Sequence, residues 1–306
     1  MDPELAVAAR SWVRRDLADL DDARRVSADF SDSVAGRDFG RRVKTTEILI
    51  AGPGSDLVLR VYTPHEAVRP LPGLLFVHGG AFVMGDLESE HYRCLILAEE
   101  AQVVVVSVDY RLAPEHPFPA GFDDVYAALC WVAAHAQSLD IDPSRIGIGG
   151  SSAGAALSAA VALAARDRGG PTLKFQLLIY PVTDDRMVTA SMARFTHTPG
   201  WDSRNSVTMW QMYLGDHSDD VSPYAAPARA ASLKHLPPAY IFAADNDPMR
   251  DEAIEFARRL IDADVPTELH YVPGTFHAFE LEVPEAEVSR RAYAEQARAT
   301  STWLRA

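Results

Sequence analysis

The sequence predicts an α/β fold, in which a mostly parallel central β-sheet has helices on both faces and carries a helical cap. Strand-like and helix-like segments alternate along most of the 306 residues. Residues 103–108 form a continuous run rich in valine, which is typical of a parallel strand covered on both faces. At 145–166 an apolar run breaks at two glycines and becomes alanine-rich, which indicates a strand, a sharp turn and a helix.

The first half of the chain predicts helices, then a hairpin, then the first parallel strands. Residues 1 to about 35 are rich in Ala, Leu, Asp and Arg, which favours one or two amphipathic helices before any strand. A Gly-Pro-Gly turn at 52–54 separates two strand patterns and predicts an antiparallel hairpin. The segments expected here are strands at 43–50, 57–62, 73–77 and 103–108 and helices at 91–101 and 122–136.

The second half continues the alternation with one interruption. Between about 184 and 231 the alternation stops, and helix-like pieces such as 206–214 indicate an insertion over the sheet. We expect this insertion and residues 1–40 to form the cap of a single domain, whose core is about 41–183 and 232–306. The remaining segments expected are strands at 146–148, 175–180, 240–244 and 267–272 and helices at 249–261 and from about 285.

Net charge and apolar patterning argue against several classes of protein. The formal charge of -14 at pH 7 disfavours binding to nucleic acid or to anionic membrane surfaces, because both require clustered Lys and Arg. No apolar run approaches the length of a membrane span. The N-terminal segment carries acidic residues early and lacks the apolar region of a secretory signal, so we expect a cytoplasmic protein.

The cysteines and histidines show no metal-site pattern. Cys94 and Cys130 each lie in a stretch that favours helix, with no motif around them, and we expect buried free thiols. The ten histidines show no ligand spacing of the H-E-x-x-H kind. The sequence therefore predicts no metal site.

A candidate nucleophile lies in the turn between the strand and the helix of 145–166. Residues 150–154 read Gly-Ser-Ser-Ala-Gly, which fits the G-x-S-x-G nucleophile elbow, where small residues let the strand and helix backbones approach each other. The frame selects Ser152, because a nucleophile at Ser151 would require glycine where Ala153 stands. An ordinary strand-to-helix turn is the alternative interpretation of these five residues alone.

A candidate base follows later in the chain. A serine hydroxyl needs a base beside it and an acid that orients this base, and after a nucleophile elbow the acid comes before the base, each on a loop that follows a strand. The strand expected at 267–272 is followed by Pro-Gly-Thr-Phe-His, so His277 is in the right place to take the proton of Ser152. The alternative is a loop histidine that is hydrogen-bonded for stability.

The candidate acid lies between the nucleophile and the base. The strand expected at 240–244 is followed by Asp-Asn-Asp-Pro, and we choose Asp247, which directly precedes a proline and a helix start. Asp245 is the rival from the residues alone. Asp251 better suits the first turn of the following helix, where a carboxylate interacts favourably with the helix dipole.

Small residues also follow the strand expected at 73–77. His78, Gly79, Gly80 and Ala81 resemble the glycine-rich loop whose backbone N–H groups form an oxyanion hole. We expect the amides of Gly80, Ala81 and Ala153 to be the donors, and the loss of one such donor costs about 3 kcal/mol of transition-state stabilisation. His78 is expected to brace the loop.

Five motifs together carry a family resemblance. They are 78–82, Asp-Tyr-Arg-Leu-Ala-Pro-Glu at 109–115, the elbow, Asp-Pro-Met-Arg-Asp-Glu at 247–252, and 274–279 around His277. As a set they resemble the hormone-sensitive-lipase family of bacterial-type carboxylesterases within the α/β-hydrolase fold, over nearly the whole chain. This resemblance implies a catalytic Ser152, Asp247 and His277, which favours Asp247 over Asp245.

The resemblance also implies a reaction and its partner. Members hydrolyse short to medium acyl esters without a cofactor, so the expected partner is a small-molecule ester, and residues 110–115 are expected to shape the wall of the site. Dimers are common in similar proteins, and the resemblance therefore allows a homodimer. Two positions depart from the family pattern: Ser151 stands where Asp or Thr is usual, and Ala81 takes the third position of the glycine loop.

The pocket and the alternative functions complete the expectations. For the substrate pocket we choose Phe82, Tyr110, Trp201 and Trp210, although Trp210 lies at helical spacing from Tyr213 and Leu214, which favours packing. A non-catalytic ligand-binding homologue, as in the gibberellin receptor branch, is expected to lack the base, and the sequence has His277. An amidase shares the same triad.

Overall fold

The computed structural model of the chain describes residues 1–12, 14–34, 39–217 and 220–305. Residues 13, 35–38 and 218–219, which belong to the expected cap, and residue 306 lie outside the described part.

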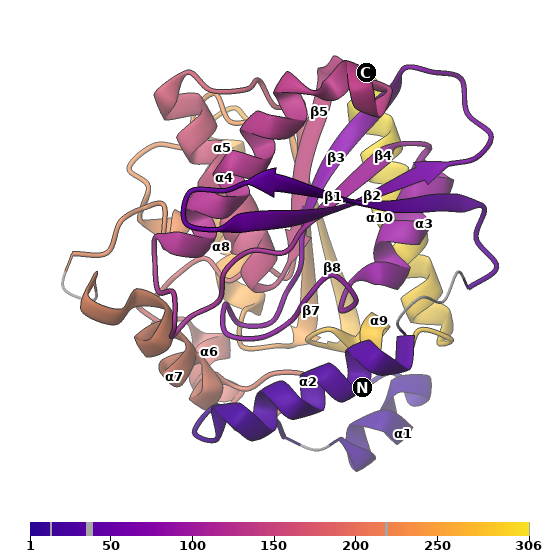
Figure 1. Cartoon of the computed structure of the whole chain (residues 1–306). Coiled ribbons are helices and arrows are strands. Elements are labelled where there is room, and N and C mark those ends of the chain that lie inside the picture. The colour runs from indigo at the N-terminus through magenta and orange to yellow at the C-terminus, as the bar shows by residue number, and fades with distance from the viewer. Residues whose placement is uncertain (13, 35–38, 218–219, 306) are drawn as a thin grey trace.

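Within the described residues, the strands form one eight-stranded sheet in the order β1-β2-β4-β3-β5-β6-β7-β8 (Figure 1). β1 and β2 form the expected antiparallel hairpin, β2 is antiparallel to β4, and all other neighbours are parallel. The prediction of a mostly parallel sheet is therefore confirmed. The strands are β1 Val43–Ala51, β2 Asp56–Pro64, β3 Leu71–Val77, β4 Val104–Val108, β5 Ile141–Ser151, β6 Phe175–Ile179, β7 Ala239–Asn246 and β8 Thr267–Phe276.

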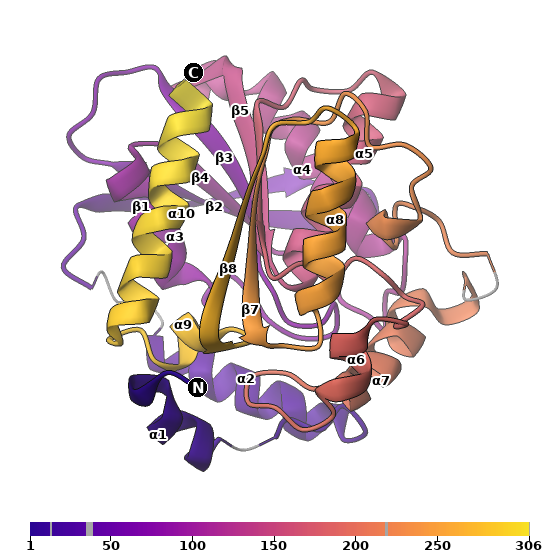
Figure 2. The ribbon, with the colours of Figure 1, turned by 180° about the vertical axis from the view of Figure 1, so that it is seen from behind.

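Helices cover both faces of the sheet (Figures 1 and 2). One core cluster lies between the sheet and α4, α5 and α8, and a second lies between the sheet and α3 and α10. Strand β4 shows this covering directly, because Val104 and Val106 belong to the first cluster and Val105 belongs to the second. The α-helices of the core are α3 His91–Ala101, α4 Ala120–Ala134, α5 Ala153–Arg168, α8 Arg250–Asp262, α9 Phe279–Glu282 and α10 Glu287–Arg305.

The remaining helices lie beyond the carboxyl ends of the parallel strands. Figures 1 and 2 show α1 and α2 on the same side of the molecule as α6 and α7, although about 150 residues separate the two pairs in the chain. These helices are α1 Pro3–Ser11, α2 Leu20–Val34, α6 Ala190–Arg194 and α7 Ser203–Leu214, and short 3₁₀ turns occupy Ala136–Leu139, Gly215–His217 and Pro227–Arg229. None of the described helices is long and apolar enough to span a bilayer.

Two strands, β5 and β8, are at least four residues longer than the sequence predicts. β5 begins at Ile141 because a second contact with β3, between Leu71 and Ile141, precedes an irregularity in the ladder. β8 continues to Phe276 because the β7–β8 ladder resumes after a shift and pairs Asn246 with Phe276. Asp247 and His277 therefore directly follow the last residues of the neighbouring strands β7 and β8. Both lie at the carboxyl ends of these strands, close to each other.

Candidate active site

The turn between β5 and α5 has the geometry of a nucleophile elbow. Ser152 has φ 53° and ψ -119°, a conformation that is strained for a residue with a side chain. A Cβ atom at Gly150 would lie 2.5 Å from the carbonyl oxygen of Val77, and one at Gly154 would lie 2.1 Å from the same atom. Both positions therefore require glycine, as the motif predicts.

The elbow, the base and the acid form one chain of hydrogen bonds. Nε2 of His277 lies 2.9 Å from Oγ of Ser152, and Nδ1 of His277 lies 2.7 Å from Oδ2 of Asp247. Asp247 is fully buried, and its other carboxylate oxygen accepts the amide N–H of Met249 at 2.9 Å. With Nδ1–H donating to this carboxylate, Nε2 is left to accept the proton of the serine hydroxyl.

The two rival aspartates lie elsewhere. Asp245 accepts hydrogen bonds from the hydroxyl of Tyr271 at 2.5 Å and from the amide of Gly274 at 3.0 Å. Asp251 accepts the amide of Ser191 at 2.7 Å, in the first turn of α8. Both carboxylates thus hold loops together, and Asp247 alone of the three contacts His277.

The glycine loop after β3 lies beside the elbow. A Cβ atom at Gly79 would lie 3.5 Å from Cβ of Ser152, and at Gly80 it would lie 2.0 Å from the carbonyl oxygen of Met84. Gly80 has φ 117°, and Ala81 follows with φ 57°, which few residues with side chains adopt. The loop is thus folded tightly onto itself next to the candidate nucleophile.

His78 braces this loop from behind. Its Nδ1 lies 2.7 Å from the carbonyl oxygen of Gly79, and its ring stacks on the ring of Tyr110 at 4.3 Å. The hydroxyl of Tyr110 donates to the carbonyl oxygen of His78 at 3.1 Å. Tyr110 therefore supports the glycine loop on the side away from Ser152.

A cavity of about 90 Å³ lies at these loops. Its wall combines the candidate catalytic groups with apolar side chains from both ends of the chain, so it can hold a small, largely apolar molecule next to the serine. The lining residues are Arg15, Ser27, Phe30, Gly79, Gly80, Ala81, Met84, Gly85, Ser89, Glu90, Ser151, Ser152, Tyr180, Gly200, Trp201, His277, Ala278, Leu281 and Glu282.

The pocket residues expected from the sequence divide into two groups. Trp201 lines the cavity, but Phe82, Tyr110 and Trp210 do not. Phe82 stacks on Tyr213 at 3.8 Å and lies 5.9 Å from Trp210, so these rings fill the interface between the glycine loop and α7. Phe82 and Trp210 thus pack in this aromatic cluster, and Tyr110 stacks on His78, so these three residues lie outside the lining of this cavity.

The donors expected for an oxyanion hole also differ in exposure. Gly79, Gly80 and Ala81 line the cavity, whereas Ala153 is fully buried as the first residue of α5. In the described part of the chain, the amides of Gly80, Ala81 and Ala153 have no recorded backbone acceptor. They are thus free to donate to a bound group.

Segments from two parts of the chain meet over the base. A Cβ atom at Gly200 would lie 1.8 Å from the carbonyl oxygen of His277, so this loop rests directly on the backbone of the base. The next residue, Trp201, has its ring 6.4 Å from the imidazole. Its Nε1 donates to Oγ of Ser206 at 3.0 Å, which fixes the indole in the wall.

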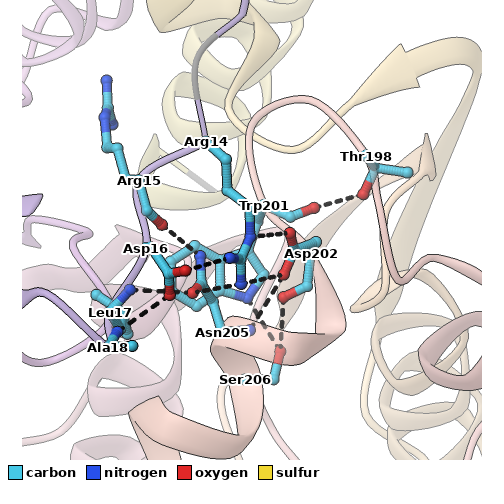
Figure 3. Close-up of polar contacts among 10 residues, drawn as sticks. All are labelled: Arg14, Arg15, Asp16, Leu17, Ala18, Thr198, Trp201, Asp202, Asn205 and Ser206. Atoms are coloured by element: carbon cyan, nitrogen blue, oxygen red, sulfur yellow. Dashed lines mark hydrogen bonds and ion pairs between the residues drawn. The ribbon is translucent and has the colours of Figure 1, made fainter.

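An ion pair ties this loop to the N-terminal segment (Figure 3). Nε of Arg14 lies 2.6 Å from Oδ2 of Asp202, a fully buried carboxylate that also caps α7. Asn205 completes the contact, since its Oδ1 accepts from Arg14 at 3.1 Å and its Nδ2 donates to the carbonyl oxygen of Arg15 at 2.6 Å. Arg15 is thereby held in the wall of the cavity, where its guanidinium lies 3.2 Å from Glu282.

Several lining residues were not found by sequence reasoning. Tyr180 directly follows β6, and its place at the carboxyl end of a parallel strand was a usable signal. Arg15 and Phe30 come from an N-terminal stretch that shows only helical composition, and no motif marks Glu90. No group of three or more His, Cys, Asp or Glu side chains that could hold a metal ion occurs among the described residues.

A hydroxyl, an imidazole and a carboxylate joined in this order, at the carboxyl edge of a mostly parallel sheet, are the arrangement of serine hydrolases. The sequence model of the alpha/beta hydrolase fold family matches residues 74–281. The chain therefore belongs to this family, and the α/β-hydrolase fold expected from the sequence is confirmed.

Similar proteins of known activity include several esterases. The chain is 42% identical over 241 residues to carboxylesterase NlhH of Mycobacterium tuberculosis, covering 76% of this chain and 75% of that protein. It is 32% identical over 266 residues to ethyl acetate hydrolase of Pseudomonas putida, covering 85% and 83%. The solved structure of a bacterial heroin esterase superimposes with a TM-score of 0.96 at 43% identity, covering 100% of this chain and 98% of that chain. These relatives confirm the resemblance to bacterial-type carboxylesterases.

Proposed function

We propose that this protein is a carboxylesterase that hydrolyses short to medium acyl esters through an acyl-enzyme on Ser152. The observation that carries the proposal is the continuous relay from Ser152 through His277 to the buried Asp247, at the wall of a cavity. The enzyme class is further supported by the similarity to carboxylesterase NlhH and to ethyl acetate hydrolase.

The relay supplies both proton transfers of acylation. Oγ of Ser152 attacks the ester carbonyl carbon while Nε2 of His277 takes the hydroxyl proton. The tetrahedral intermediate collapses, its bond to the alkoxy oxygen breaks, and the imidazolium returns the proton to the leaving alcohol. Asp247 holds the imidazole in the required tautomer and stabilises its positive charge in this step.

Deacylation repeats the sequence with water. His277 removes a proton from a water molecule that attacks the acyl carbon, and the imidazolium then protonates Oγ of Ser152 as the carboxylic acid leaves. In both steps the amides of Gly80, Ala81 and Ala153 are the donors to the negative oxygen. Two observations support this assignment: these amides have no recorded backbone acceptor in the described part of the chain, and Gly80 and Ala81 lie in the cavity wall.

The cavity limits the substrate. Its volume of about 90 Å³ and its lining by Phe30, Met84, Trp201 and Leu281 suit a short apolar acyl chain. We expect the specificity constant to rise to an optimum at or below about eight carbons and then to fall. A series of p-nitrophenyl esters from acetate to palmitate measures this, and a value still rising at laurate contradicts the expectation.

The central test compares the wild type with Ser152→Ala. Release of p-nitrophenol from the butyrate ester is expected from the wild type and is expected to fall by at least about 10⁴-fold in the variant. Ser138→Ala is the matched control, because Ser138 is an exposed serine in the 3₁₀ turn that precedes β5, at the opposite end of that strand from Ser152. Ser138→Ala should keep the wild-type rate.

Mass spectrometry identifies the acylated residue. Diethyl p-nitrophenyl phosphate should add one diethylphosphoryl group to the wild type, on the peptide that contains Ser152, and should leave Ser152→Ala unmodified. Equal ester hydrolysis by the wild type and Ser152→Ala contradicts the proposal. A wild type that binds the ester and releases no product identifies a non-catalytic binding protein instead.

A further inference from the structure

A fully buried arginine lies behind the candidate active site. Nε of Arg93, in α3, donates to Glu90 at 2.7 Å, and one terminal nitrogen donates to Gln296 at 2.6 Å and to Glu280 at 3.2 Å. The other terminal nitrogen donates to the hydroxyl of Tyr180 at 3.1 Å. Every nitrogen of the guanidinium thus has a partner, and the partners are the residue that caps α3, one residue each of α9 and α10, and the residue that follows β6.

One arm of this network reaches the nucleophile elbow. Oγ of Ser151, the residue before the nucleophile, donates a short hydrogen bond to the carboxylate of Glu90. On its other side Ser151 is confined by the glycine loop, because a Cβ atom at Gly79 would lie 2.9 Å from its Oγ. Arg93 therefore fixes Glu90, and Glu90 fixes the peptide that carries Ser152.

The other arms reach the base. The ring of Tyr180 lies 4.6 Å from the imidazole of His277, inclined at 54°. Glu280 lies three residues after His277, in α9, and its carbonyl oxygen accepts the hydroxyl of Tyr293 at 3.0 Å. Arg93 thus holds both the ring that contacts the imidazole and the helix that follows it.

The composition of the cluster calls for a reason beyond packing. Arg93 and Glu280 are fully buried and Glu90 nearly so, and apolar residues of similar volume commonly stabilise a core as well as a buried ion pair does. Burial lowers the pKa of Arg93, but the charge of Glu90 opposes this effect and holds the pKa well above its ordinary value. The guanidinium therefore stays charged, and a charged fork with five donors can join four groups at fixed angles, which no apolar side chain can do.

We propose that Arg93 is a positioning residue, which keeps the hydroxyl of Ser152 and the imidazole of His277 in register by holding Glu90 and Ser151 on one side and Tyr180 and Glu280 on the other. This proposal rests on the proposed ester hydrolysis at Ser152. Its consequence is specific: loss of the network should slow the chemical steps while most of the ester binding is retained, because the apolar side chains of the wall, Phe30, Met84, Trp201 and Leu281, lie outside the network.

The test uses a double variant that keeps the cluster's net charge. Arg93→Met together with Glu90→Gln removes one positive and one negative charge and substitutes side chains of similar length. Because Glu280 then loses its cation, circular dichroism checks that the variant folds before rates are compared. We expect kcat for p-nitrophenyl butyrate to fall about 30- to 100-fold, with KM within about twofold of the wild type. Phosphorylation of Ser152 by diethyl p-nitrophenyl phosphate should slow by a similar factor, because it also needs the aligned pair.

Two further variants separate the arms. Ser151→Ala removes only the link to the elbow, and Tyr180→Phe removes only the hydrogen bond of Arg93 while it keeps the ring against His277. Each should lower kcat about three- to tenfold at unchanged KM, with a smaller effect than that of the double variant. Arg93→Lys, which keeps the charge without the planar fork, should recover only part of the rate that the double variant loses.

A structural arginine elsewhere is the control. Arg259, near the end of α8, donates to the carbonyl oxygens of Ala228 and Ala230 and contacts neither loop of the site. Arg259→Met should lower the melting temperature and leave kcat at 25 °C within about twofold of the wild type. If it lowers kcat as much as the double variant does, a general loss of stability explains both, and the positioning role is wrong.

The outcomes remain distinct if the double variant does not fold, because Ser151→Ala and Tyr180→Phe each remove one hydrogen bond and test the same claim. Wild-type kcat in both of these variants contradicts the positioning role, even when Ser152→Ala is inactive. Activity that persists in Ser152→Ala instead contradicts the proposed function. The two failures therefore give different patterns of rates.

Discussion

The two sides of the candidate site are held by different kinds of interaction. Behind the elbow, Arg93 is fully buried, and every nitrogen of its guanidinium donates to a partner within the core. On the cap side, Arg14 holds Asp202 and Arg15 holds Glu282, and both arginine side chains remain 27% exposed. Buried contacts fix geometry, whereas part-exposed ion pairs are weaker and are screened by salt. We therefore expect the network around Arg93, the core side, to control the rate of the chemical steps. The ion pairs of Arg14 and Arg15, the cap side, should control the access and affinity of the ester.

A second comparison concerns two buried glutamates on opposite sides of the elbow. Glu90 has a guanidinium at 2.7 Å, whereas among the described residues Glu252 in α8 has no cation within ion-pair distance and accepts the backbone amides of Thr183 at 2.5 Å and Asp184 at 3.4 Å. Burial raises the pKa of Glu252 well above its ordinary value, and these amides lower it only in part. Burial of Glu252 is thus offset by backbone donors alone, whereas burial of Glu90 is offset by a guanidinium.

The largest effect is expected from a substitution of Asp247, the candidate acid. Asp247→Asn keeps the shape of the side chain but can favour the wrong imidazole tautomer, and kcat for p-nitrophenyl butyrate should fall about 10⁴-fold with little change in KM. Asp245→Asn is the matched control, because Asp245 bonds Tyr271 and Gly274 and does not contact the base. A loss of rate in Asp245→Asn that equals the loss in Asp247→Asn contradicts the assignment of the acid.

A smaller effect, on KM instead of kcat, is expected from removing the ion pair between Arg14 and Asp202. Arg14→Ala leaves the buried carboxylate of Asp202 without its ion-pair partner and loosens the loop that carries Trp201. We expect KM for the butyrate ester to rise about tenfold while kcat changes less than about threefold. The control is Arg25→Ala, since Arg25 forms exposed pairs with Asp22 and Asp29 on α2 and should leave both constants unchanged.

Enlarging the cavity at Trp201 tests whether the cap side limits the length of the acyl chain. Trp201→Ala removes the ring from the wall, and the preference for decanoate over butyrate esters, measured as a ratio of kcat/KM, should rise about fivefold. Trp210→Phe alters the aromatic cluster outside the cavity and should leave that ratio unchanged. An equal shift in both variants indicates that the chain length is selected elsewhere.

The smallest expected effect is on thermal stability and comes from Glu252, the buried glutamate that is held by backbone amides. Because the pKa of Glu252 is raised in the folded state, its contribution to stability is fully present below its unfolded pKa of about 4.3 and is lost as the pH rises toward the folded value. Glu252→Gln keeps an oxygen that accepts from the amides of Thr183 and Asp184, and it removes the loss of stability that ionisation of the glutamate causes at higher pH. Its melting temperature should exceed that of the wild type by a few degrees (about 2–4 °C) at pH 8, with a smaller excess at pH 5. A larger excess at pH 5 contradicts the sign of the shift.

The elbow was accessible from the sequence because local backbone geometry dictates it, and the order of the three loops along the chain indicated its partners. Gly150 and Gly154 are the positions where any Cβ atom collides with Val77, so their spacing records the close contact of strand and helix. The choice among three aspartates was harder, because Asp245 and Asp247 both follow the strand expected at 240–244. In the structure Asn246 pairs with Phe276, so the residues after them, Asp247 and His277, lie side by side and form a hydrogen bond.

The cavity wall was not accessible, for a physical reason. Which aromatic side chains line a pocket depends on how distant segments pack, and an apolar residue at helical spacing suits a core as well as a pocket. Phe82 and Trp210 pack in the core with Tyr213, whereas Trp201 lines the cavity. Arg15 reached the wall through Asn205, about 190 residues away, a contact that no local pattern records.

The contact of Gly200 with His277 limits how the substrate range can be altered. The loop that carries Gly200 rests on the backbone of His277, so bulkier residues there would displace the imidazole. Ser27 and Phe30 line the same cavity from α2, which is separate in the chain from every loop of the relay. Engineering for larger esters should therefore start on α2, where side chains can be exchanged without moving the imidazole.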